Sequence, residues 1–231
     1  MRTALIIPTY NEASNIGKLI RTLKSLKLNI KIVVVDDGSP DGTSEIVSEI
    51  SDVALISRKG KLGLGSAYKE GFKYALKRGC DVVGTMDADF SHDPKFLPAM
   101  LAKIKNCDMV IGSRYVEGGD IIGFNFGRKL ISGAAQFMSR TFLGLNVKDA
   151  TSGYRIYKSK VLAKIEYASI SSQGYSYLIE SLFLANRCGF DIREVPIVFK
   201  NRRFGSSKIS GAEIIKALFT VIRLKYKFNT S

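Results

Sequence analysis

Two carboxylates separated by a single residue, Asp87 and Asp89, directly follow a short apolar run at 82–86. An apolar run of this length that contains Val and Thr is typical of a buried strand. In an open α/β sheet, ligands bind beyond the carboxyl ends of the strands, so both acids are expected at the mouth of a site. Oxygen donors at this spacing suit Mg²⁺ or Mn²⁺ carried on a diphosphate. The alternative is that the two acids only end a strand and begin a turn, which Asp does often.

Polar residues also follow two other expected strands, at 4–7 and 31–35. Tyr10 comes after the first of them and could stack on a nucleobase. Asp36 and Asp37 come after the second and could accept hydrogen bonds from a base N–H or a ribose hydroxyl. Taken singly, each has an ordinary alternative, because the two acids begin a good turn sequence and the tyrosine could be packing. Together, at three neighbouring strand ends, these residues favour a nucleotide site.

Strands alternate with amphipathic helices along the first half of the chain. This alternation predicts βαβ units and an α/β fold with a mostly parallel sheet covered by helices on both faces. Pro8 is expected to end the first strand, and Asn11 or Ser14 to cap the first helix. The glycine-rich run at 60–65 is expected to form a tight turn before a helix, with Lys61 near phosphate. The expected strands are 4–7, 31–35, 53–56, 82–86, 109–113, 154–157 and 192–199, the last with a break at Pro196. The expected helices are one that ends at about 26, one at 41–50, one that ends at about 78, one capped by Asp93, and three more at 128–143, 175–187 and 211–227.

The chain of 231 residues carries 35 Lys and Arg against 21 Asp and Glu, a formal charge of +14. This excess indicates an anionic partner, which could be nucleic acid, an anionic membrane surface or a phosphorylated substrate. One histidine, His92, argues against a His-based metal site or a Ser-His-Asp triad. Three cysteines without metal spacing are expected to be reduced thiols of an intracellular protein. No run reaches the roughly 20 apolar residues that cross a bilayer, and no secretory signal is expected.

Two helical segments, 129–143 and 211–227, have one apolar and one basic side, which is the pattern of an interfacial helix. Anionic lipids attract each nearby Lys or Arg by about 1 kcal/mol, so several give peripheral adhesion. The alternative is that the apolar sides simply cover the sheet, and a small transmembrane partner protein could supply firmer anchoring. We expect one domain at 1–210, followed at 211–231 by a C-terminal amphipathic helix on the domain or at the membrane.

Seven motifs in this sequence resemble those of the dolichol-phosphate mannose synthases, which are inverting family 2 glycosyltransferases of the GT-A fold. The resemblance spans nearly the whole chain, with the motifs in the family's order, and is strongest to the short form without transmembrane helices. The motifs are IIPTYNE (6–12), VVVDDGSPDGT (33–43), GLGSAYKEGF (63–72), MDADFSHDPK (86–95), GSRYVEGG (112–119), SGYRIY (152–157) and GSSK (205–208).

The resemblance implies transfer of mannose from GDP-mannose to dolichyl (polyprenyl) phosphate at the cytoplasmic face of a membrane. It also implies roles for individual positions. The nucleoside of GDP-mannose would be held by Pro8, Tyr10, Glu12, Val35 and Asp37, with Asp36 beside them. The divalent metal, Mg²⁺ or Mn²⁺, would be held by Asp87, Asp89 and Ser91. The phosphates of donor and acceptor would be met by Arg114, Arg128 and Ser132, and the loop that closes over the site would carry Arg202 and Lys208.

Simple chemistry agrees with these implications. A diphosphate needs a dication to become a good leaving group, and an acceptor phosphate needs guanidinium groups to approach it. A phosphate monoester has a second pKa of about 6, so near neutral pH it is already an anionic nucleophile. A strong general base is therefore unnecessary, although His92 invites the hypothesis that it acts in catalysis.

Three rival functions can be weighed on the sequence. The same fold could use another donor, such as UDP-glucose with polyprenyl phosphate, because few side chains read the base. A non-catalytic nucleic-acid-binding protein would explain the charge, but acids at three strand ends would repel a phosphate backbone. An oxidoreductase that uses a dinucleotide is disfavoured, because no G-x-G-x-x-G follows the first strand.

Overall fold

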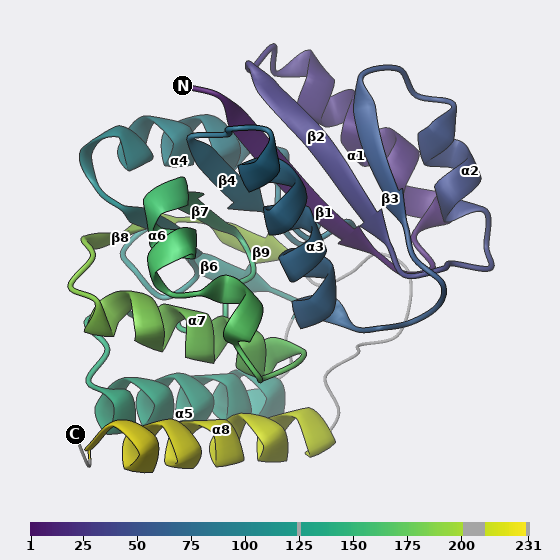
Figure 1. The fold of residues 1–231 in the computed structure, drawn as a ribbon. Coiled ribbons are helices and arrows are strands. Elements are labelled where there is room, and N and C mark those ends of the chain that lie inside the picture. The colour runs from purple at the N-terminus through teal and green to yellow at the C-terminus, as the bar shows by residue number, and fades with distance from the viewer. Residues whose placement is uncertain (124–125, 201–210, 230–231) are drawn as a thin grey trace.

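The apolar and amphipathic segments of the first half fold into alternating strands and helices, as predicted. The computed structural model describes residues 1–123, 126–200 and 211–229 (Figure 1). Asp93 caps the turn that begins at Pro94, as expected, by accepting a hydrogen bond from the N–H of Lys95. The elements of this half are β1 (Thr3–Thr9), α1 (Ala13–Ser25), β2 (Ile30–Asp36), α2 (Thr43–Ser48), β3 (Val53–Ser57), α3 (Leu64–Lys77), β4 (Val82–Thr85), η1 (Pro94–Phe96), α4 (Leu97–Lys103), η2 (Ile104–Asn106) and β5 (Met109–Ser113).

The second half completes the same sheet and adds a helical layer. A two-stranded parallel sheet forms between its shortest strands, β6 and β9. The elements of this half are β6 (Asp120–Ile122), α5 (Phe126–Leu143), β7 (Arg155–Lys158), α6 (Ser159–Lys164), η3 (Tyr167–Ser169), α7 (Tyr175–Arg187), β8 (Ile192–Pro196), β9 (Val198–Lys200) and α8 (Gly211–Asn229).

The central sheet has seven strands in the order β3-β2-β1-β4-β7-β5-β8. Six of them run parallel, and β7 is antiparallel to both of its neighbours. The predicted α/β fold with a mostly parallel sheet is therefore confirmed. β7 begins at the edge where its parallel neighbours end, since its first residue, Arg155, pairs with Thr85 of β4 and Ile111 of β5. The carboxyl ends of β1, β2 and β4 meet at one edge, where Thr9 pairs with Asp36 and Ile6 with Thr85.

Pro8 does not end the first strand, which corrects the prediction, because β1 continues to Thr9. The register of β1 with β4 ends at Ile6, whereas its register with β2 continues to Thr9. Proline is tolerated in a strand where the neighbour on one side has already ended. The last residues of β1 thus pair with β2 alone, at the edge where the site forms.

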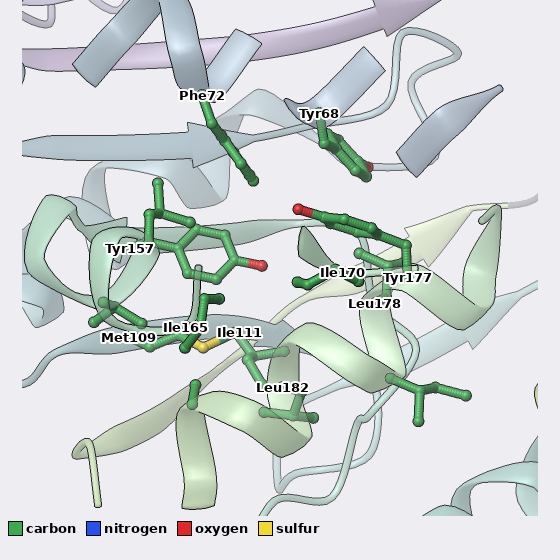
Figure 2. Packing of buried hydrophobic residues seen from close by; sticks show 14 of the residues in the cluster. Tyr68, Phe72, Met109, Ile111, Tyr157, Ile165, Ile170, Tyr177, Leu178 and Leu182 are labelled. Carbon is green, nitrogen blue, oxygen red and sulfur yellow. The ribbon is translucent and has the colours of Figure 1, made fainter. Parts of the chain in front are cut away.

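Side chains alternate between the two faces of the sheet, and each face has its own core. In β1, Ala4 and Ile6 join the core under α3, α6, α7 and α8, while Leu5 and Ile7 join the core under α1, α2 and α4. Aromatic rings from different elements meet in the first core, as Figure 2 shows. The ring of Tyr68 lies 5.9 Å from that of Tyr177, and the ring of Phe72 lies 5.7 Å from that of Tyr157. Helices thus cover both faces, as predicted.

The glycines of the run at 63–72 serve helix packing. Gly63 has a φ of +91° and precedes the first residue of α3, so the helix expected after the glycine-rich run is confirmed. At Gly71, an added Cβ would lie 2.3 Å from Cγ2 of Ile6 in β1. Glycine at this position therefore sets how closely α3 approaches the sheet.

We expect Gly71→Ala to destabilise the fold by about 1–3 kcal/mol, because the new methyl overlaps a buried strand residue. Gly133→Ala, in the middle of α5, is the matched control, since an added Cβ there meets no atom of the described residues within 4 Å. In a helix interior that change should stabilise by roughly 0.5–1 kcal/mol. Chemical denaturation of both variants measures the difference. Equal stability of the two variants would contradict the close approach of α3 to β1.

The long helices α5 and α8 lie side by side as an outer layer (Figure 1). Val221 and Leu224 of α8 are buried in the core, so its inner side packs on the domain. Large apolar side chains of the same two helices remain exposed on the outside. No helix in the described ranges combines the length and apolar character needed to cross a membrane. The division into a domain at 1–210 and a C-terminal helix at 211–231 stays a prediction. The exposed apolar residues of α5 and α8 are Phe137, Phe142, Leu218, Phe219, Ile222 and Tyr226.

Candidate active site

The three strand ends border one cavity of about 300 Å³. Its lining includes six residues predicted from the sequence, which are far apart along the chain and meet because β1, β2 and β4 are neighbours. Lys61 also lines it, with its Nζ 4.4 Å from the ring centre of Tyr10. The lining residues are Pro8, Thr9, Tyr10, Glu12, Asp37, Lys61, Gly63, Leu64, Ala67, Asp87, Ala88, Asp89 and Gly174.

Asp37 is held in place by an ion pair that the sequence did not predict. One of its oxygens accepts a hydrogen bond from Arg58 and the other accepts one from the N–H of Gly63 at 2.8 Å. Both side chains of the ion pair are less than a tenth exposed. The pairing orients the carboxylate at the cavity, so that its remaining lone pairs can accept from a ligand.

Asp36 and Val35 lie behind the cavity rather than in its lining, since both are 0% exposed. Asp36 accepts hydrogen bonds from the hydroxyls of Thr9 at 2.7 Å, Ser39 at 2.6 Å and Ser44 at 2.9 Å. Burial alone would raise the pKa of Asp36, but these hydrogen bonds hold that pKa below its usual value of 3.8. The turn that was the alternative for Asp36 is therefore present, and it supports the strand end.

The loop after β2 caps the first helix, which corrects the prediction of Asn11 or Ser14 as the cap. Glu12 is the N-cap residue, and no side chain of its own helix caps it. Instead, Asp41 accepts from the N–H of Ala13 at 3.0 Å, and Thr43 Oγ1 accepts from the N–H of Glu12 at 3.0 Å. The motif at 33–43 thus fixes the segment that carries Tyr10 and Glu12.

Asp87 and Asp89 follow β4 and bring two carboxylates to the cavity. The side chain of Asp87 is 25% exposed, whereas Asp89 is 4% exposed. Among the described residues no group of three or more His, Cys, Asp or Glu side chains could hold a metal. Two carboxylates beside open space fit Mg²⁺ or Mn²⁺, since such ions keep waters and are usually bound through one or two carboxylates plus substrate phosphates.

Ser91 and His92 support this acidic loop from behind. The hydroxyl and N–H of Ser91 donate to Oδ1 of Asp89 at 2.6 and 3.0 Å, so the serine orients a carboxylate. Nδ1 of His92 accepts from the N–H of Asp87 at 3.1 Å, and the ring stacks on Tyr154 at 5.1 Å. Burial lowers the pKa of His92 below 6.5, so the ring is neutral at pH 7. Neither residue belongs to the cavity lining, and the histidine positions the loop.

Arg114 belongs to a buried polar cluster around Asp149 and is not among the residues that line the cavity. Its Nε and Nη2 each donate to Asp149 at 2.7 Å, and its Nη2 also donates to Thr151 at 2.8 Å. Gln136 of α5 donates to the same aspartate at 3.2 Å. Burial would raise the pKa of Asp149, but the charge and hydrogen bonds of Arg114 keep that pKa below 3.8. Asp149 was missed because its partner lies 35 residues away, and only an acid just before the motif at 152–157 could have signalled it.

The side chains of four predicted site residues lie outside the described part of the structure. Arg128 and Ser132 lie on the first half of α5, where the structure describes the helix but not these side chains. Arg202 and Lys208 lie in 201–210, outside the described residues. Their roles stay predictions.

Comparison with known proteins identifies the family of this chain. Residues 4–166 match the family described as Glycosyl transferase family 2. The chain belongs to this family. The glycosyltransferase is 41% identical over 227 residues to the undecaprenyl-phosphate mannosyltransferase of Micrococcus luteus, covering 96% of this chain and 93% of that protein. It is also 41% identical over 226 residues to the polyprenol monophosphomannose synthase of Mycolicibacterium smegmatis, covering 95% of this chain and 85% of that protein.

Solved structures of similar fold confirm the GT-A architecture of this glycosyltransferase. Glucosyl-3-phosphoglycerate synthase from Mycobacterium tuberculosis, in complex with Mn²⁺, UDP and phosphoglyceric acid, superposes with a TM-score of 0.74 at 21% identity, over 97% of this chain and 78% of that one. The mannosyltransferase PcManGT from Pyrobaculum calidifontis, in complex with GDP-Man and Mn²⁺, gives 0.65 at 16% identity, over 98% and 64%. At these identities the likeness concerns the fold.

Proposed function

We propose that this glycosyltransferase moves mannose from GDP-mannose to a polyprenyl (dolichyl) phosphate, with inversion, giving polyprenyl-phosphate mannose and GDP. The observation that carries the proposal is the pair of relatives, each 41% identical over nearly the whole chain and each named for mannose and a polyprenol or its phosphate. The cavity at the strand ends supports it, because aromatic, carboxylate and ammonium side chains line the same space.

The nucleoside end of the donor is assigned to the part of the cavity around Tyr10 and Asp37. The ring of Tyr10 offers a stacking face, and the carboxylate of Asp37 offers acceptors for a base or ribose. Lys61 now lies over that ring, so it is placed to meet the donor phosphates once a base occupies the ring face. Pro8 and Glu12 complete this end of the cavity.

Asp87 and Asp89 are the residues assigned to Mg²⁺ or Mn²⁺, with Ser91 fixing Asp89 from behind. A bound dication would supply charge neutralisation for the departing diphosphate. An oxygen of the acceptor phosphate attacks the anomeric carbon from the face opposite to the diphosphate, and the bond from that carbon to the diphosphate oxygen breaks. The acceptor oxygen is already ionised near pH 7, so no side chain has to remove a proton.

Arg114 is assigned to phosphate binding, together with Arg128, Ser132, Arg202 and Lys208, whose roles rest on the family resemblance. A guanidinium held by a buried carboxylate keeps a fixed orientation, which favours positioning of an anionic substrate. The geometry thus assigns Asp149 and Gln136 to the support of Arg114.

The enzyme must reach a lipid acceptor that lies in a bilayer. We assign the outer side of α5 and α8 as the surface that contacts the cytoplasmic face of the membrane. Exposed Phe137 and Phe219 supply apolar contact, while exposed Arg140, Lys216 and Lys225 supply positive charge. Apolar and basic side chains on one surface are typical of peripheral binding to anionic membranes. A small transmembrane partner protein covering the same apolar side chains is the alternative anchor.

A donor panel tests the proposed reaction. With Mg²⁺ or Mn²⁺ and polyprenyl phosphate, GDP-mannose should exceed UDP-glucose in kcat/KM by at least about 100-fold, because a site that hydrogen-bonds one base leaves groups unpaired with another. Transfer should stop with EDTA and return when the metal is added back. Radiolabelled sugar in the lipid extract measures the product. Equal turnover of both donors would reject GDP-mannose as the specific donor, and transfer in EDTA would reject the metal.

A further inference from the structure

A second cavity, of about 360 Å³, lies between α8 and the segment 172–176, where the chain enters α7. The same segment borders both cavities, since Gly174 lines the first whereas Gln173 and Ser176 line the second. Nothing in the proposed transfer of mannose uses this second cavity. Its lining consists of Ser172, Gln173, Ser176, Lys216, Phe219, Thr220 and Arg223.

The polar side chains of this cavity include one that is buried without a hydrogen-bond partner. Ser176 is 3% exposed, and its Oγ makes no hydrogen bond within the described part of the chain. A buried hydroxyl without a partner costs free energy, so native proteins rarely leave one unless a ligand or water satisfies it. Ser172 and Thr220 add two more hydroxyls, 3.5 Å apart, on the same lining.

Two basic side chains, Lys216 and Arg223, line the cavity. Arg223 donates to the hydroxyl of Ser172 at 2.9 Å and to the carboxylate of Glu180 at 2.6 Å, and this fixes its guanidinium at the wall. Glu180 is 7% exposed and compensates one positive charge. The exposed ammonium of Lys216 is the second positive charge on the lining. Hydroxyl groups together with Lys and Arg are the donors that hold phosphate oxygens.

The surroundings favour a phosphate that is attached to a lipid. Phe219 lines the cavity and is 67% exposed, and Leu218 and Ile222 beside it on α8 are 39% and 41% exposed. An anion site bordered by exposed apolar side chains suits a ligand with a charged head and an apolar tail. We propose that this cavity binds the phosphate of an anionic glycerophospholipid and thereby seats α8 on the membrane. The proposal rests on the membrane docking in the proposed function and deepens it.

Vesicle binding by the full chain tests the headgroup site. Vesicles of phosphatidylcholine with phosphatidylglycerol should bind wild type, and Ser176→Ala should weaken that binding about fivefold although no charge changes. Ser48→Ala, at an exposed serine of α2, is the matched control and should bind as wild type does. Lys216→Gln should weaken binding about tenfold or more, and Lys225→Gln, on the same helix but outside the lining, about fivefold or less. Wild-type affinity of Ser176→Ala, or equal losses for the two lysine variants, would overturn the site.

Two further experiments distinguish a lipid phosphate from free phosphate, and the headgroup site from the proposed reaction. Inorganic phosphate at millimolar concentration should not displace the vesicles, and displacement that Ser176→Ala abolishes would assign the cavity to free phosphate instead. Transfer of mannose to a short-chain, water-soluble polyprenyl phosphate should be the same in wild type and Ser176→Ala. If wild type fails to transfer mannose but Ser176→Ala still weakens vesicle binding, the headgroup site stands and the proposed reaction falls. If transfer is intact and the variant binds vesicles as wild type does, the reaction stands and the headgroup site falls.

Discussion

Asp89→Asn is expected to lower the turnover of mannose transfer by about 10³-fold or more with little change in stability. The asparagine keeps the shape of the side chain and an oxygen that can accept from Ser91, but it removes the negative charge that a dication requires. Asp89→Ala should abolish transfer as well, at the additional cost of leaving both Ser91 donors without their acceptor. The loss should appear in kcat rather than in the folding transition.

Asp52→Asn is the matched control for this charge removal. Asp52 is exposed on the loop between α2 and β3, and asparagine tolerates its φ of +61°. It should retain full activity. Calorimetry of GDP-mannose with and without Mn²⁺ gives the second readout, since wild type should bind more tightly with the metal and Asp89→Asn should not. Normal turnover of Asp89→Asn, or donor binding that is equally tight in EDTA for wild type, would sink the metal assignment.

Asp149→Ala should destabilise the fold by about 3–5 kcal/mol, the usual cost of removing one partner from a buried ion pair. Asp149 is 0% exposed and accepts from Arg114, Gln136 and the N–H groups of Thr151 and Ser152. Its removal leaves the guanidinium of Arg114 buried without its carboxylate. Chemical denaturation measures the stability, and transfer activity should fall with it because Arg114 loses its orientation.

An exposed ion pair, between Asp191 and Arg193, provides the matched control for Asp149→Ala. Asp191 pairs with Arg193 at 2.6 Å, but the two side chains are 41% and 59% exposed. Asp191→Ala should therefore cost at most about 1 kcal/mol. If both alanine variants were equally stable, the cluster around Arg114 would not be the buried network described above.

The pH dependence gives an independent check on Asp149. Its folded-state pKa lies below the ordinary value of 3.8, so its ionised form stabilises the folded protein. That contribution is fully present above the unfolded pKa and is lost as the pH falls through the lower folded-state pKa. The stability difference between wild type and Asp149→Ala should therefore be constant near neutral pH and shrink below about pH 4. A difference that grows on acidification would contradict the lowered pKa.

The sequence by itself determined the sheet, the helices on both faces and the edge that carries the site. These features depend on local patterns, namely apolar runs at strand spacing, amphipathic helices between them and polar residues at the strand ends. Because parallel strands bring their carboxyl ends together, Tyr10, Asp37, Asp87 and Asp89 could be predicted to meet before any contact was known. The cavity that they border is the outcome of that rule.

Only the tertiary structure decided which side chains face the ligand and which support them. Asp36 and Asp37 are adjacent and chemically identical, yet one is buried in a turn and the other lines the cavity beside Arg58. Arg114 directly follows β5, and Asp149 lies in the loop before the antiparallel β7. Their ion pair therefore joins residues that are 35 positions apart in the sequence. Such pairs form when packing brings distant segments together, and no local pattern encodes the direction in which a strand enters the sheet.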